Sequence, residues 1–310
     1  MTRDRFWRIV RRYWLVIVCV GLIAVAPMVR PARPAPGDEQ TRDQTGGYPQ
    51  RIISLVPAVT EMLFAIGGDD RVVAVSSFDH YPPAVELKPR VGALVDPDFE
   101  RIIALRPDLV VVYGTQSDLI QRLQRLQIPI FSYENTDIAE LTKTIATLGE
   151  RIGRVREAAS EVDRITRGID EVTSLVAGAP RPKTALLFGR DLGTLRGIFA
   201  SGGVGFMHDV LIAAGADDVF ADVTRQSLQV STETLLARAP ETIVEAYPKG
   251  DWTPALIASE TLVWRGLPTL PAVRNGRVYI LADDALVVPG PRIVTAVRLM
   301  AHALHPDRVK

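Results

Sequence analysis

The stretch DFERIIALRPDLVVVY, residues 98–113, has a counterpart 133 positions later in STETLLARAPETIVEA, residues 231–246. Each pattern places an acid in the first turn of a short helix, then a proline that stops the helix, then a buried strand. Any two helix–strand units look partly alike, but one copy in each half of the chain predicts two similar lobes. The identical residues are Glu100 with Glu233, Ala104 with Ala237, and Pro107 with Pro240.

Short β-branched runs alternate with helical patterns on both sides of these units. This alternation predicts an α/β fold in which helices cover parallel sheets. The strand patterns are residues 51–56, 71–77, 108–113 and 129–133 in the first half, and 184–190, 242–246 and 277–282 in the second.

A long amphipathic pattern separates the two halves. Apolar residues recur every three or four positions through residues 151–178, and Pro180 and Pro182 follow. We expect a helix that connects an N-terminal α/β lobe, residues 50–150, to a C-terminal α/β lobe, residues 179–310, with a ligand cleft between them. A surface helix of one lobe is the alternative.

The N-terminus has the pattern of an export signal. Arginines precede an apolar run that ends at Val29, so residues 1–29 are expected to be a signal peptide or an uncleaved membrane anchor. Residues 30–49, rich in proline, glycine and charge, are expected to be a linker. The single cysteine, Cys19, lies in the signal, which fits an oxidising compartment.

Charge and motifs exclude several classes of protein. The 310 residues carry no net charge, but residues 1–34 hold seven arginines and one acid, so the remainder carries about −6. A mildly acidic body argues against binding to nucleic acid. The chain has no P-loop, G-x-S-x-G, H-E-x-x-H or C-x-x-C motif, which argues against common α/β enzymes.

Four segments in the expected order resemble the periplasmic binding proteins for iron chelates and cobalamin. The resemblance covers about residues 50–306 and is closest in layout to the cobalamin-binding members. It implies two lobes bridged by a backbone helix, a corrinoid or ferric chelate held between the lobes, and delivery to an ABC permease and its ATPase. A monomer without a cofactor is expected. The segments are RIISLVPAVTEMLFAIG (51–67), VSSFDHYPP (75–83), DFERIIALRPDLVVVYG (98–114) and WRGLPTLPAVRNGRVYIL (264–281).

The resemblance assigns two acids to docking. Glu100 and Glu233 match the positions at which cobalamin receptors engage arginines of the permease. Exposed carboxylates suit this role because they orient a complex with a basic partner. The alternative is that each acid complements only its helix dipole, which stabilises by about 0.3–1 kcal/mol.

The resemblance also assigns a ligand site. Pro57, Tyr81, Tyr113 and Asp284 match positions that line the pocket, and tyrosine offers a flat apolar face with a polar tip. Leu94 and Ser227 stand where that subfamily has tryptophans, and Val288 stands where it has an arginine, which leaves the identity of the chelate open. Arg190 could pair with an anionic chelate, or could be a solvated surface residue.

Two other classes of function remain as alternatives. An exported α/β enzyme acting on a phosphorylated or small polar substrate could use the glycines of residues 202–205 to cradle a phosphate, although a plain helix-entry turn fits them as well. A free-metal binder needs converging histidines, and this chain has four, of which His80 and His208 could face a cleft.

Overall fold

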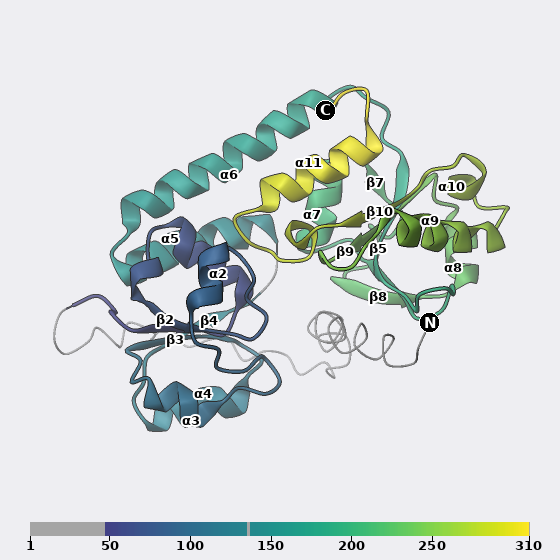
Figure 1. The fold of residues 1–310 in the computed structure, drawn as a ribbon. Coiled ribbons are helices and arrows are strands. Elements are labelled where there is room, and N and C mark those ends of the chain that lie inside the picture. Colours follow the sequence, from purple (N-terminus) through teal and green to yellow (C-terminus); the bar gives the residue numbers. More distant parts are fainter. Residues whose placement is uncertain (1–46, 135–136, 310) are drawn as a thin grey trace. The chain divides into compact units, whose positions relative to one another are not determined.

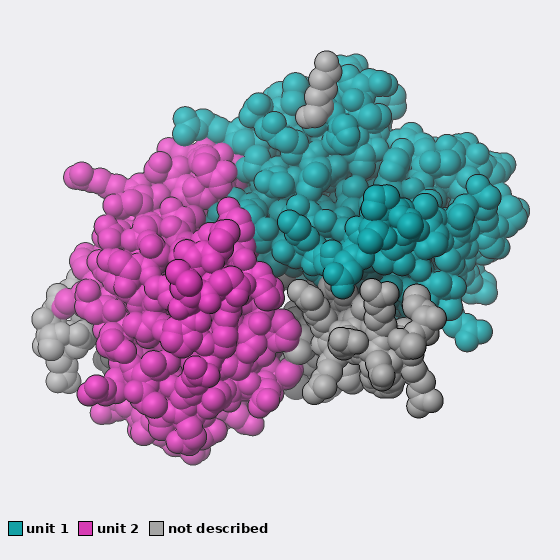
Figure 2. All heavy atoms as spheres, viewed as in Figure 1, with its two compact units in different colours: residues 1–27, 136–138, 166–310 teal, residues 28–135, 139–165 magenta. Residues whose placement is uncertain are grey.

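The computed structural model describes residues 47–134 and 137–309. The described chain divides into two compact units, coloured separately in Figure 2. The N-terminal unit holds residues 47–134 and 139–165, and the C-terminal unit holds residues 137–138 and 166–309. The predicted signal or anchor, with Cys19, and most of the predicted linker lie outside the described residues.

The N-terminal unit contains a four-stranded sheet in the order β2-β1-β3-β4, and all of its strands are parallel. Helices α2 and α5 lie on one face of this sheet and α3 and α4 on the other (Figure 1). The predicted parallel α/β arrangement of this half is therefore confirmed. The elements are β1 (Ile52–Ser54), α2 (Pro57–Ala65), β2 (Val72–Val75), α3 (Phe99–Ala104), β3 (Leu109–Tyr113), α4 (Ser117–Arg125), β4 (Ile130–Tyr133) and α5 (Ile138–Ile152), with 3-10 turns at Asp69–Arg71 and Pro83–Leu87.

The sheet of the C-terminal unit has the order β10-β9-β5-β6-β8, with β7 paired to β5. Strands β10, β9 and β5 are parallel, as predicted. The short strand β7, which was not predicted, is parallel to β5, whereas β6 is antiparallel to both of its neighbours. The elements are β5 (Lys183–Gly189), β6 (Ile198–Ser201), α7 (Phe206–Ala213), β7 (Asp217–Asp218), β8 (Ser227–Val230), α8 (Thr232–Arg238), β9 (Thr242–Tyr247), α9 (Pro254–Val263), α10 (Pro271–Arg274), β10 (Val278–Ala282) and α11 (Ile293–Leu304), with 3-10 turns at Trp264–Gly266 and Asp284–Leu286.

Alternation along the strands builds the core of each unit. Side chains two positions apart point to the same face of a sheet, so Ala185, Leu187 and Ile243 reach one core cluster together with Trp264. In the N-terminal unit, Ile53, Val110 and Val112 pack with residues of α3 and α4 in the same way.

The repeated unit of the sequence is a repeat in the structure. Helices α3 and α8 begin alike, because Asp98 and Ser231 accept hydrogen bonds from the backbone N–H three residues on. They also end alike, because Arg106 has φ of 46° and Ala239 has φ of 47°. Positive φ is uncommon outside glycine, so its recurrence at equivalent positions is strong support for two similar lobes.

The long helix is α6 (Val155–Val176), and it passes from the N-terminal unit into the C-terminal unit after Ile165. In the C-terminal unit α6 packs against α11 at Gly168. A Cβ atom at Gly168 would lie 2.7 and 2.9 Å from the two γ-carbons of Val294. The glycine that weakens the helix is therefore explained by a close helix–helix contact.

We predict that Gly168→Ala is stabilising only when Val294 is shortened. Alanine in place of glycine favours a helix by about 1 kcal/mol, but the side chain of Val294 occupies the space. Gly168→Ala/Val294→Ala is expected to be more stable than Val294→Ala by about 1 kcal/mol, as measured by chemical unfolding. An equal gain from Gly168→Ala in the unmodified protein would contradict this packing.

Candidate functional site

Three of the predicted ligand residues follow neighbouring strands of the N-terminal sheet. Pro57 is the first residue of α2 and comes three positions after the end of β1, Tyr81 lies in the loop after β2, and Tyr113 ends β3. Because these strands are parallel, their carboxyl ends meet at one edge, where α/β proteins commonly bind ligands. Tyr81 is 43% exposed, and Tyr113 is partly exposed with its ring edge-on to Tyr133.

Gln116 joins Leu94 to this edge. Its side-chain oxygen accepts a hydrogen bond from the Tyr113 backbone N–H at 3.0 Å, and its amide nitrogen donates to the Leu94 carbonyl at 2.9 Å. Gln116 is buried, so these bonds are well shielded from water. The structure thus brings Leu94 next to Tyr113. Gln116 was not predicted from the sequence, although a glutamine directly before a helix, where Ser, Thr, Asp or Asn is usual, was a signal.

The loop that carries Tyr81 is held by a buried acid, Asp79, which was not predicted from the sequence either. Asp79 accepts hydrogen bonds from the backbone N–H and the hydroxyl of Ser76 at 2.8 and 2.6 Å. Arg90 donates to the carbonyls of Ser76 and Asp79 and pairs with Glu86. Burial raises the pKa of Asp79 to about 6, against these hydrogen bonds.

A second edge of the same kind lies in the C-terminal unit. Arg190 follows β5, Tyr247 ends β9, and Asp284 comes shortly after β10. Asp284 accepts a hydrogen bond from the Lys249 backbone N–H at 2.9 Å, which ties together the loops that follow β9 and β10.

Arg190 is neither a solvated surface residue nor an exposed cation at this edge. Its guanidinium is buried, lies 3.1 Å from Glu245 and 2.8 Å from Glu260, and also donates to the Glu260 carbonyl. Burial disfavours its charged form, but the charge of Glu245 and the hydrogen bonds to both acids outweigh that effect and raise the pKa of Arg190. The alternative that Arg190 is a solvated surface residue is therefore wrong. The observed partners of Arg190 are two carboxylates of the protein itself.

Glu245 is the centre of this buried cluster. It also accepts hydrogen bonds from the Tyr247 hydroxyl at 2.6 Å and from the indole N–H of Trp264. Burial, together with the charge of Glu245, raises the pKa of the Tyr247 hydroxyl. Tyr247 is therefore a neutral hydrogen-bond donor held in one orientation.

Ser227 does not lie at the carboxyl edge of the C-terminal sheet. Ser227 is buried, and its partner on the neighbouring strand β6 is Ser201. This pair lies three positions further into the sheet than the pair of Ile198 with Val230. The structure therefore does not bring it together with Asp284 and Tyr247.

The glycines before α7 serve packing. A Cβ atom on Gly202 would lie 2.0 Å from the Arg225 carbonyl oxygen, and one on Gly203 would lie 2.1 Å from the Ala221 carbonyl oxygen. The close approach of two backbone segments accounts for both residues, so a helix-entry turn explains them without a phosphate.

The two predicted docking acids are exposed and occupy equivalent places. Glu100 lies in the first turn of α3, and Glu233 lies in the first turn of α8. Hydrogen bonds, first of all from Ser231, lower the pKa of Glu233, so it is a carboxylate at neutral pH.

The described histidines do not converge. His80 pairs with Glu86 and His208 with Asp218, each in a different unit. Within residues 47–134 and 137–309, no group of three or more His, Cys, Asp or Glu side chains could hold a metal ion. In the same part of the chain, no helix has the length and apolar character needed to cross a bilayer.

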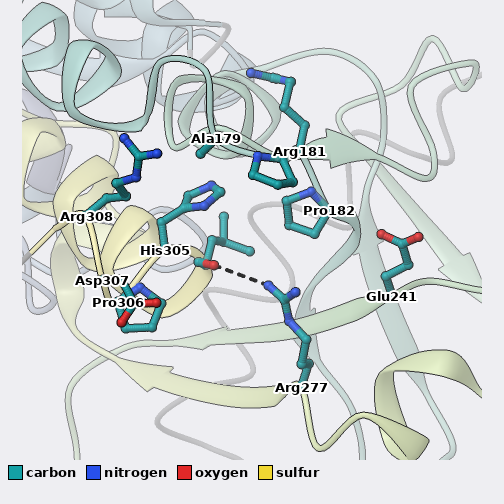
Figure 3. Close-up of a pocket in the computed structure, with 11 residues that line it drawn as sticks. Ala179, Arg181, Pro182, Glu241, Arg277, His305, Pro306, Asp307 and Arg308 are labelled. Carbon is teal, nitrogen blue, oxygen red and sulfur yellow. Dashed lines mark hydrogen bonds between the residues drawn. The ribbon is translucent and has the colours of Figure 1, made fainter.

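A hollow of about 300 Å³ lies at the opposite edge of the C-terminal sheet (Figure 3). It is lined by residues that precede β5, β9 and β10, among them Pro182, Glu241 and Arg277. Arg277 donates to the Leu304 carbonyl at 3.2 Å, the bond dashed in the figure. The hollow is therefore separate from the carboxyl edge that holds Tyr247 and Asp284.

A family model described as a periplasmic binding protein matches residues 52–285, across both units and α6. The chain belongs to this family. Its members are binding proteins, and the prediction of a carrier in the iron-chelate and cobalamin class is confirmed at the level of the family.

Known relatives of this periplasmic binding protein differ in what they bind. The vitamin B12-binding protein of Salmonella typhimurium is 29% identical over 256 residues, which cover 82% of this chain and 90% of that one. An uncharacterised ABC transporter substrate-binding lipoprotein, YvrC of Bacillus subtilis, is 26% identical, with 84% and 82% covered. The crystal structure of a periplasmic heme-binding protein from Pseudomonas aeruginosa has a TM-score of 0.70 at 25% identity, with 84% and 94% covered. The family and the lipoprotein relative point to an exported protein, as the sequence predicts.

We predict that Arg190→Met destabilises this binding protein by about 3–5 kcal/mol, because it leaves two carboxyls buried without their cation. Chemical unfolding of the purified variant measures the change. Arg196→Met, which alters an exposed arginine of the same loop, is the control and is expected to change stability by less than about 0.5 kcal/mol. Equal stability of the two variants would show that the cluster is not needed.

Proposed function

We propose that this protein is the substrate-binding component of an ABC importer, that it captures a corrinoid or ferric chelate, and that it catalyses no reaction. Residues 1–29 direct its export. The observation that carries the proposal is the family match over residues 52–285, which spans both units. The relatives named above include a vitamin B12-binding protein and a heme-binding protein, both of which take bulky metal chelates.

The residues at the carboxyl edge of the N-terminal sheet suit such a ligand chemically. Tyr81 and Tyr113 each combine an apolar ring with a hydroxyl, and Pro57 and Leu94 add apolar surface. Asp284 supplies a polar group in the C-terminal unit. We leave Arg190 and Ser227 out of the proposed ligand set because both are buried within their own unit. The ligand cleft between the lobes stays a prediction.

We also propose that Glu100 and Glu233 dock the loaded protein on basic residues of the permease. Both acids are exposed, and they occupy equivalent positions on α3 and α8. Charges of this kind act mainly on orientation and on the rate of encounter.

The first test is ligand binding. The purified full-length protein is expected to bind at least one of cyanocobalamin, cobinamide, haem and ferrichrome with sub-micromolar affinity in calorimetry. The same samples should return the ligand chemically unchanged. Failure of all four ligands would overturn the proposed ligand class.

The second test separates docking from ligand capture. Glu100→Ala/Glu233→Ala is expected to keep its ligand affinity but to slow uptake into vesicles that contain the permease and ATPase. Charge reversal to lysine should slow uptake further, because it adds repulsion. Glu150→Ala/Asp307→Ala, which removes one exposed acid from each unit away from α3 and α8, is the matched control. Uptake equal to that of the control would reduce Glu100 and Glu233 to helix-stabilising residues.

A further inference from the structure

An arginine of α4 lies over an aromatic ring of α3. The guanidinium carbon of Arg122 is 3.5 Å from the centroid of the Phe99 ring. Phe99 is the first residue of α3 and directly precedes Glu100, one of the two proposed docking acids. The helices α3 and α4 lie on the same face of the N-terminal sheet (Figure 1). The stacked arginine therefore belongs to the same part of the surface as Glu100.

The ring beneath the arginine is fixed by the core of the N-terminal unit. Phe99 is partly buried and packs against the cluster that contains Ile102 and Leu123. A cation over an aromatic face is attracted by the electrons of the ring. The planar guanidinium of Arg122 is therefore held in one orientation, and it loses less freedom than a lysine side chain would when a partner binds.

The N–H groups of Arg122 are available to a partner. Arg122 is exposed, and within residues 47–134 and 137–309 its guanidinium makes neither a hydrogen bond nor an ion pair. Stacking covers only the face of a guanidinium, so the N–H donors at its edge can bind a carboxylate bidentately. Arg101 and Arg125 are also exposed on α3 and α4, but among the described residues neither stacks on a ring. Stacking is what distinguishes Arg122 from these ordinary surface arginines.

The C-terminal unit has a similar arginine whose N–H groups are already used. Arg238 of α8 lies with its guanidinium carbon 5.5 Å from the centroid of the Phe220 ring. Its two terminal nitrogens donate to the carboxylate of Asp222 at 2.8 and 2.9 Å. The protein itself therefore neutralises the stacked cation on the helix of Glu233, whereas it leaves the stacked cation near Glu100 unpaired. The two equivalent helices thus present different patterns of charge.

We propose that Glu100 and Arg122 form a docking patch of mixed charge, which fits a permease surface that presents a carboxylate beside an arginine or lysine. This inference rests on the proposed function and deepens it, because it names the chemistry of the partner at one of the two docking acids. A patch with both signs fixes orientation more strictly than a single acid does, since a rotated partner would place like charges together. The surface that meets Glu233 needs only the basic group.

The test measures how fast variants of the full-length protein associate with the permease and ATPase held in nanodiscs. Arg122→Met removes the charge but keeps an apolar side chain over Phe99, and it is expected to slow association by about fivefold. Arg122→Lys keeps the charge but loses the planar fork, so it should associate within about twofold of the unmodified rate and dissociate faster. Arg125→Met is the control, because it removes an equal charge from the same helix, and its association rate should change by less than about twofold. Thermal unfolding of each variant checks that it is folded.

The outcomes separate this inference from the function on which it rests. Equal association rates for Arg122→Met and Arg125→Met would overturn the mixed patch, and slowed association of Glu100→Ala/Glu233→Ala would then leave docking by the two acids standing. Faster association of Arg122→Met would also overturn the patch, since it would show that the partner is basic throughout. If the unmodified protein does not associate with the permease at all, both the patch and the proposed importer function fail.

Discussion

The direction of the strands is the constraint on which the rest of the structure depends. All four strands of the N-terminal sheet are parallel, and so are β10, β9, β5 and β7 of the C-terminal sheet. A parallel pair needs a crossover connection, so the loops after the strands all leave from one edge. This geometry brings Tyr81 and Tyr113 to one edge, although they are far apart in the chain. It places Tyr247 and Asp284 on the corresponding edge of the other unit.

Much of this arrangement could be predicted from the sequence, because the patterns that mark these strands and the helices before them lie within short stretches of the chain. The runs at β3 and β9 are apolar and β-branched, and each follows a helix with a recognisable start and a proline stop. Strands β6, β7 and β8 were not predicted. β7 has two residues, and IFAS and SLQV are four residues long and mix apolar with polar residues. Strands this short gain their stability from pairing with neighbours, which a local pattern does not record.

The interior contacts of the site could not be predicted in the same way. Arg190 meets Glu245 and Glu260 across 55 and 70 positions of sequence, so no local pattern distinguishes it from an exposed arginine. Gln116 likewise joins Leu94 to Tyr113 by one side chain whose role is visible only after folding. The equivalent placement of Glu100 and Glu233 could be predicted, because the repeat in the sequence aligns the two acids with each other.

The buried carboxyl of Asp79 gives the N-terminal unit an unusual response to acidity. Its pKa in the folded protein is about 6, against an ordinary value of 3.8, so the folded state holds this proton more tightly than the unfolded chain does. The contribution of Asp79 therefore favours folding by roughly 3 kcal/mol below pH 4, and that contribution fades as the pH rises through 6. Most acids with stabilising partners act in the opposite direction and make a protein sensitive to acid. Through this one group, the folded state is therefore more stable relative to the unfolded chain in a mildly acidic medium than in a neutral one.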